Sequence, residues 1–246
     1  MASLTGLFPP CPPRRPDAAA RPRFTLLTLA VCFCATTASP ALPDFLQEAL
    51  GKFNPVVPPG WAYTQTTERD KLTTTERFDP VQPPAEQWTL LRYNGQAPSA
   101  PELEKYGRFK AANPTSAAQA AFQKGDIDPG SIVLIREDSE RAVFSCAFRA
   151  ESADSDKMLG HLHLQLVVNK RQPQVEKFRL GLREPYSPVL GVKMNGLIVE
   201  MIFSAPTSDR PSLPAVSTSH FVGRILFFFG TEENLRLTYF DFTRRN

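Results

Sequence analysis

The sequence predicts an α+β fold that is mostly antiparallel β: a curved half-barrel sheet of about ten strands wrapped around one or two helices. Apolar and polar residues alternate with a period of two in many short runs between residues 61 and 242. Helical spacing of apolar residues is confined to two short segments. No internal repeat is visible, which argues against a propeller or a solenoid. Because so large a sheet does not stay flat, we expect it to curl around the helices.

Residues 1–41 have the anatomy of a secretory signal peptide. A cluster of arginines precedes the apolar segment Phe24–Cys34, which is shorter than the roughly 20 residues of a membrane-spanning helix. Small residues at Ser39 and Ala41 offer a cleavage site, so we expect the mature chain to begin near Leu42. A lipid anchor on Cys32 is the alternative, but Val31 is a poor residue before a lipidated cysteine. The leader therefore predicts export to the periplasm, without a lipid anchor.

The mature segment, residues 42–246, has the length of a single domain. Without the leader the chain has 24 basic and 24 acidic residues, so the basic surplus belongs to the leader. A protein that binds nucleic acid through phosphates needs a cationic face, and this balance disfavours nucleic acid as a partner. Cys146 is the only cysteine left after cleavage, which rules out an internal disulfide. Its strand pattern predicts a buried thiol between Phe144 and Phe148.

The first elements are a short helix and a hairpin. Residues 42–53 (LPDFLQEALGKF) place apolar side chains at helical spacing, and the prolines between Asn54 and Gly60 end this segment. The runs 61–69 (WAYTQTTER) and 71–78 (KLTTTERF) are rich in Thr and aromatic residues and are separated by a very short link. They are therefore expected to pair as a hairpin.

A corner and a second helix follow. The prolines between Asp79 and Pro84 interrupt the sheet before a strand at 86–93 (EQWTLLRY), which the turn pair Asn94-Gly95 ends. Ser99 stands three residues before Glu102, the spacing of a capping box, so a helix is expected to begin at Ser99. Its apolar stripe comprises Leu103, Tyr106, Phe109 and Lys110.

The rest of the chain, after Gly130, is expected to be antiparallel sheet with one wet face. The Pro- and Ser-rich stretch Ala205–Ser219 is predicted to be its longest loop. In the run GRILFFFG, Ile225 and Phe227 fall on one face while Leu226 and Phe228 fall on the other. Such a strand is either covered by protein on both faces or lines an apolar cavity of a half-open barrel.

No catalytic or cofactor signature accompanies this pattern. The sequence contains neither a Gly-x-Ser-x-Gly elbow nor a phosphate-binding glycine loop, and it has no paired Cys-x-x-Cys. His161, His163 and His220 could be combined into a metal site, but histidines two apart on a wet strand face are typically solvated. The acidic run at Glu151–Asp156 is interpreted as a solvated turn. We therefore predict no enzyme activity, no cofactor and no metal.

The segments WAYTQTTERD, LTTTERFDP and WTLLRYNGQAP, with a helical insert before a long antiparallel run, resemble bacterial envelope proteins of the periplasmic lipoprotein-carrier superfamily. This resemblance to outer-membrane lipoprotein carriers implies a half-barrel closed on one side by helices over an apolar cavity. The Arg that holds the closed state in that superfamily has no counterpart that can be assigned in this sequence.

Two functions are carried forward. The first is a periplasmic binding or carrier protein that holds a lipid or another apolar ligand in the concave cavity and is not an integral membrane protein. The second is an envelope scaffold or stress-sensing module that binds a protein partner, with the 205–219 loop at the contact. The expected ligand contacts of the first are Trp61, Tyr63, Trp88, Leu90, Phe178, Leu180, Phe227 and Phe229.

Overall fold

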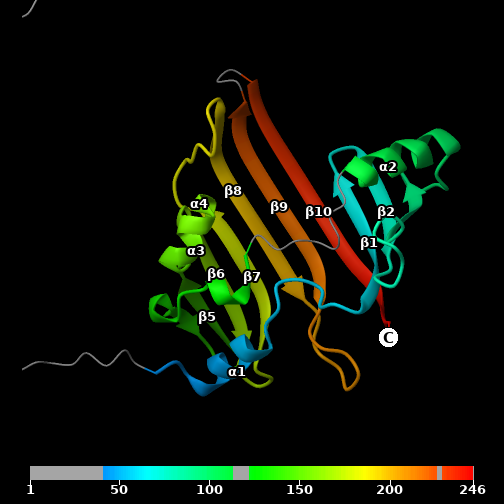
Figure 1. Ribbon diagram of the computed structural model, residues 1–246. Helices are drawn as coiled ribbons and strands as arrows, with labels where there is room; N and C mark the ends of the chain where they lie inside the picture. The colour runs from blue at the N-terminus through cyan, green and yellow to red at the C-terminus, as the bar shows by residue number, and fades with distance from the viewer. Residues whose placement is uncertain (1–40, 113–121, 226–228, 246) are drawn as a thin grey trace, which may run out of the picture. The chain divides into compact units, whose positions relative to one another are not determined.

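A computed structural model describes residues 41–112, 122–225 and 229–245 of the chain. Within these residues the strands form one antiparallel sheet in the order β3-β2-β1-β10-β9-β8-β7-β6-β5-β4, open and curled (Figure 1). The predicted mostly antiparallel α+β class is confirmed. The strands are β1 Trp61–Arg69, β2 Leu72–Phe78, β3 Trp88–Tyr93, β4 Val133–Glu137, β5 Arg141–Cys146, β6 Leu162–Asn169, β7 Gln174–Leu182, β8 Val192–Phe203, β9 Pro214–Ile225 and β10 Phe229–Arg244. The predicted signal peptide lies outside the described residues, apart from Ala41.

The strand order explains why the sheet is open. Every pair of strands adjacent in the sequence is also adjacent in the sheet, except β3 and β4, and the first strand pairs with the last. A β3–β4 pairing would close this meander into a barrel. The segment 94–132 instead leads from one edge of the sheet to the other, and it carries helix α2 (Ala100–Ala112) and two short 3-10 turns. The helical insert therefore takes the place of a strand pairing.

Helix α1 (Asp44–Lys52) covers the concave face over β6 and β7. Leu46 and Ala49 are completely buried there, and Phe53 stacks edge-on against Phe178 at 6.3 Å between ring centroids. The strands beneath supply one continuous apolar row, because Leu166 pairs with Phe178 in the β6–β7 ladder. Alternation places these residues on one face, so this half of the concave side is a filled core.

Two short helices, α3 (Ala150–Ser155) and α4 (Lys157–Gly160), follow β5. The acidic run that was interpreted as a turn forms α3, and Asp156 caps α4 by accepting a hydrogen bond from the Met158 N–H at 3.0 Å. The loop between β8 and β9 is shorter than the predicted Ala205–Ser219, because β9 includes the second part of that stretch. Strand β9 begins at Pro214, and both Ser217 and Ser219 pair with residues of β8 on one side and of β10 on the other.

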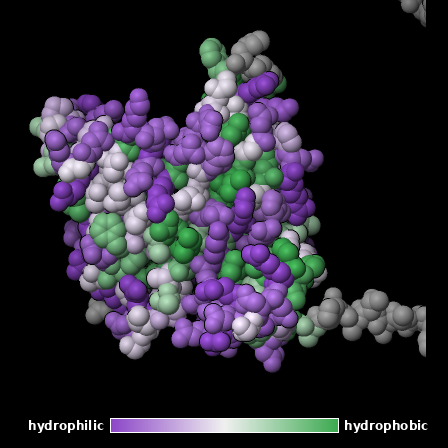
Figure 2. Space-filling view, turned by 180° about the vertical axis from the view of Figure 1, so that it is seen from behind, coloured by the Kyte–Doolittle hydropathy of each residue, from purple (hydrophilic) through white to green (hydrophobic). Residues whose placement is uncertain are grey.

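The face away from these helices is mainly hydrophilic, with apolar side chains between the polar ones (Figure 2). Cross-strand ion pairs occupy it: Glu200 of β8 lies 2.9 Å from Lys177 and 3.7 Å from Arg179 of β7. His163 of β6 lies over Gly181 of β7, where a Cβ would come within 2.3 Å of the imidazole ring. A glycine in this strand therefore makes room for a histidine on the neighbouring one.

Candidate functional site: a groove beneath helix α2

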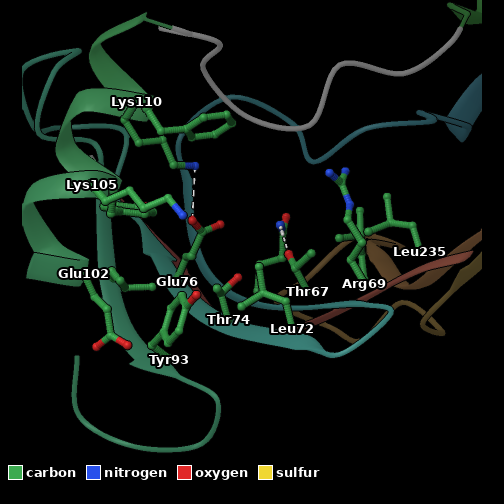
Figure 3. Close-up of a pocket in the computed structure, with 15 residues that line it drawn as sticks. Thr67, Arg69, Leu72, Thr74, Glu76, Tyr93, Glu102, Lys105, Lys110 and Leu235 are labelled. Carbon is green, nitrogen blue, oxygen red and sulfur yellow. Dashed lines mark hydrogen bonds and ion pairs between the residues drawn. The ribbon is translucent and has the colours of Figure 1, made fainter. Parts of the chain in front are cut away.

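A groove with a volume of about 450 Å³ lies between α2 and the concave face of strands β1, β2, β3 and β10 (Figure 3). Four leucines, Leu72, Leu90, Leu235 and Leu237, line it from the sheet. Tyr106 and Phe109 line it from the helix. The remaining lining residues are Gln65, Thr67, Arg69, Thr74, Glu76, Tyr93, Glu102, Lys105 and Lys110.

The groove exists because α2 does not pack tightly on the sheet. None of the residues of α2 is buried, in contrast to α1. Leu103 is 46% exposed and Phe109 is 59% exposed, although both belong to the predicted apolar stripe. A helix whose apolar stripe stays accessible leaves apolar surface for another molecule.

A partly buried ion pair ties α2 to the sheet. The Lys110 ammonium lies 3.3 Å from the Glu76 carboxylate, and the two side chains are 20% and 10% exposed. The same ammonium lies 4.2 Å from the centroid of the Trp88 ring and 5.2 Å from that of Tyr106. An aromatic face attracts a cation, so three groups hold Lys110 in place at the end of the groove nearest Trp88. We call this contact the Lys110–Glu76 latch.

One aromatic donor beside the latch, the Trp88 Nε1–H, is buried without a hydrogen-bond partner among the described residues. Burial, then the negative charge of Glu76 and a hydrogen bond with its carboxylate, raise the pKa of Tyr106 well above its usual range. Tyr106 therefore stays neutral at ordinary pH. Buried polar groups in proteins are nearly always paired, and each exception calls for an explanation.

Charged side chains also line the groove. Arg69 forms an ion pair with Glu233 at 3.0 Å. Glu102 accepts hydrogen bonds from both the N–H and the hydroxyl of Ser99, which lowers the pKa of this carboxyl. Lys105 points into the groove (Figure 3) and has no ion-pair partner among the described residues. Lys105 and Glu102 therefore contribute one positive and one negative charge to the groove lining, and neither has an ion-pair partner among the described residues.

The predicted ligand contacts are distributed over several places. Leu90 lines the groove. Trp61 and Tyr63 are buried on β1, and Tyr63 and Trp88 belong to an aromatic cluster next to the latch, with ring centroids 5.8 Å apart. Phe178 and Leu180 lie in the filled core beneath α1, 3% and 1% exposed. Phe229 is an exposed residue at the start of β10. Phe227 lies outside the described residues.

Sequence reasoning missed the latch and most of the groove wall. The sequence pattern puts Lys110 on the apolar stripe of the helix but gives no sign that Glu76 of β2 is its partner. The signal that could have found them is the alternation in β2, which puts Glu76 on the same face as Leu72 and Thr74. A charge on that face needs a partner from whatever covers it.

The three histidines do not meet. His161 stacks on Tyr186 with 4.0 Å between ring centroids, and His220 lies 2.8 Å from Asn234. Among the described residues no group of three His, Cys, Asp or Glu side chains could hold a metal ion. Cys146 is buried beneath the helices, and burial raises the pKa of its thiol to about 12.

The fold and the groove define a class: an open, curled antiparallel sheet with a separate helix standing over one end of its concave face. No family model, no curated protein and no solved structure matches the chain. In the part of the chain that the structure describes, no helix is both long and apolar enough to cross a membrane.

Proposed function

We propose that the protein is a periplasmic binding or carrier protein that holds a lipid or another apolar ligand in the groove beneath α2. The observation that carries this proposal is that Tyr106 and the exposed Phe109 of α2 line the same groove as four leucines of the sheet. Ligand sites in proteins are concave, mostly apolar and fitted with a few polar groups. The groove has this composition.

The polar groups suit the head of an amphipathic ligand. Tyr106 lines the groove beside the Lys110–Glu76 latch, with its ring 5.2 Å from the Lys110 ammonium. Lys105 points into the groove (Figure 3). An alkyl chain along the leucines, with a carboxylate or another oxygen-bearing head beside Lys105, would give this ammonium a partner. The leader predicted at residues 1–41 supports an envelope location.

A titration with the fluorescent fatty acid cis-parinaric acid tests the proposal, with native mass spectrometry of the purified protein to detect a ligand that co-purifies. The groove variants Phe109→Ser and Leu235→Ser are expected to weaken binding on the order of tenfold each, because each removes part of the apolar wall. Phe240→Ser, which alters another exposed phenylalanine outside the groove lining, is the control and should bind like the wild type.

Absence of both a co-purifying ligand and parinarate binding would contradict the proposal. So would groove variants that bind as well as the Phe240→Ser control. Unfolding curves of all three variants separate a loss of the groove from a loss of the fold.

A second candidate, an envelope scaffold that binds a protein partner, is favoured by one observation. Strand β4 is an edge of the sheet, and Val133, Leu134 and Ile135 on it are 46–61% exposed. Exposed apolar edge strands accept strands from other chains. Crosslinking in the periplasm that captures a protein through β4, together with no ligand in the groove, would favour the scaffold.

A further inference from the structure

Four apolar side chains are exposed where β8, β9 and β10 meet at one end of the sheet. Val189 and Leu190 lie in the turn before β8 and are 61% and 94% exposed. Ile225 at the end of β9 and Phe229 at the start of β10 are 47% and 68% exposed. Val192 pairs with Ile225, and Ile225 with Phe229, so the turn and both strand ends are adjacent (Figure 1). We call these four residues the β8–β10 tip.

Two cations stand directly behind the tip. Lys193 of β8 is paired with Arg224 of β9 in the ladder, so their side chains are direct cross-strand neighbours on one face. Both are exposed, and neither has an ion-pair partner among the described residues. Elsewhere on this face basic residues meet carboxylates, as Lys177 meets Glu200 at 2.9 Å. Like charges directly opposite each other destabilise a sheet, so this pair is unfavourable for the folded chain alone.

A single exposed apolar residue needs no explanation, and a lone lysine is normally solvated. Here, however, four exposed apolar side chains and an uncompensated basic pair occupy the same end of three adjacent strands. Figure 2 shows green side chains at this upper end of the sheet beside purple ones. The combination fits a partner that offers negative charge at its surface and hydrocarbon beneath it.

We propose that the β8–β10 tip docks on the surface of an anionic lipid bilayer. One strand residue advances about 3.3 Å, so Lys193 and Arg224 lie roughly one such step behind Val192 and Ile225. Apolar side chains of interfacial proteins enter about 5–10 Å into the boundary between headgroups and acyl chains. Leu190 and Phe229 thus reach the acyl boundary while Lys193 and Arg224 stay among the phosphates.

This inference does not depend on the proposed ligand groove. No residue of the tip lines the groove beneath α2, and the lining leucines belong to other positions of the strands. The tip would nevertheless bring a carrier to the membrane from which it takes its ligand. The two proposals can fail separately. The protein could dock on vesicles without binding fatty acid, or bind fatty acid without docking, and the two assays distinguish these outcomes.

The experiment is co-sedimentation of the full chain with vesicles of phosphatidylcholine containing about 30 mol% phosphatidylglycerol, beside vesicles of phosphatidylcholine alone. We expect binding to the anionic vesicles that weakens as salt is added. The Lys193→Gln/Arg224→Gln variant should bind about 25-fold more weakly, at roughly fivefold for each cation. The Leu190→Ser/Phe229→Ser variant should lose at least tenfold.

Matched controls lie on β4 and in the β1–β2 turn. Val189→Ser is a further tip variant that should weaken binding, and Val133→Ser on β4 is its control, because both valines are 61% exposed. Lys71→Gln/Arg136→Gln removes two other exposed cations and so changes the net charge equally. Because the leader is present in every variant, its own affinity for lipid cancels in these comparisons.

Hydrogen exchange with and without vesicles gives a readout at the site itself. Protection of amides in 186–193 and 229–231, with none in 133–137, supports the proposal. Equal binding by tip and control variants overturns it, as does no preference for anionic vesicles. Capture of a protein through the tip in the periplasm, without vesicle binding, would assign the surface to a protein partner instead.

Discussion

Lys110 and Glu76 are a residue-scale contact between α2 and the sheet. Because both side chains are mostly buried, removing one leaves the other charge without compensation. We expect Lys110→Met and Glu76→Gln each to lower the free energy of unfolding by about 1–3 kcal/mol. The double variant should lose less than the sum of the two, which urea denaturation of all four proteins measures as a coupling energy.

Additive losses in this double-mutant cycle would show that the latch contributes nothing as a pair. Glu104→Gln, which alters the exposed ion pair of Glu104 with Arg108 on the same helix, is the control. Exposed pairs contribute little, so this change should fall within about 0.5 kcal/mol of the wild type.

His163 makes folding stability depend on pH. Desolvation by burial, and then the positive charge of Arg183, lower its pKa, and a hydrogen bond with the backbone of Gly181 opposes them. The unfolded chain therefore takes up a proton more readily than the folded one. Stability from this group is present above pH about 6.5 and declines as the pH falls below that value.

Urea unfolding at several pH values between about 7 and 5 measures this decline. His163→Gln is expected to flatten it, whereas His220→Gln, a histidine in the same cross-strand row, should leave this part of the profile in place. An identical pH profile for His163→Gln and the wild type would remove His163 from the explanation.

At the scale of the element, α2 is a helix that depends on its own cap. Glu102 accepts hydrogen bonds from both the N–H and the hydroxyl of Ser99, at 2.7 and 2.8 Å. The helix itself buries no residue in the core. We expect Glu102→Ala to speed hydrogen exchange in the first turn of α2 with little change in global unfolding. Acid should act in the same direction, because protonation removes the charge that Ser99 stabilises.

Glu104→Ala on the same helix is the matched control, since Glu104 pairs only with Arg108 at the surface. In this variant the rate of amide hydrogen exchange in the first turn of α2 should stay close to that of the wild type. If Glu102→Ala instead lowered global stability as strongly as a core substitution, α2 would be part of the cooperative core.

At the scale of the whole sheet, the concave face has a filled half and an open half. Leu164 of β6 is completely buried beneath the helices, whereas Leu235 of β10 is only half-buried in the groove wall. Leu164→Ala should therefore lower the free energy of unfolding by about 2–5 kcal/mol. Leu235→Ala should lower it by about 1 kcal/mol or less, because little packing surrounds its side chain.

Urea denaturation compares the two variants, which make the same change on the same face of one sheet. Equal losses would mean that the groove half is packed like the core. Parinarate binding should show the reverse order, with Leu235→Ala the more affected of the two.

The sequence alone determined the local structure of this protein. Period-two alternation predicted the strands, the short link after Arg69 predicted the first hairpin, and Ser99 with Glu102 predicted the start of α2, because each of these signals acts between residues close along the chain. Only the tertiary structure decided where those elements lie. The alternation that places Leu180 and Leu235 on the same face cannot tell which is covered by α1 and which faces the groove.

That difference depends on which helix covers which strands: α1 packs on β6 and β7, whereas α2 lies against β3 at the edge of the sheet without burying a residue. The Lys110–Glu76 latch and the Lys193–Arg224 pair arise in the same way, from residues more than 30 positions apart in the chain. Their energies depend on burial and on neighbouring charge, which are properties of the packed sheet rather than of any single segment.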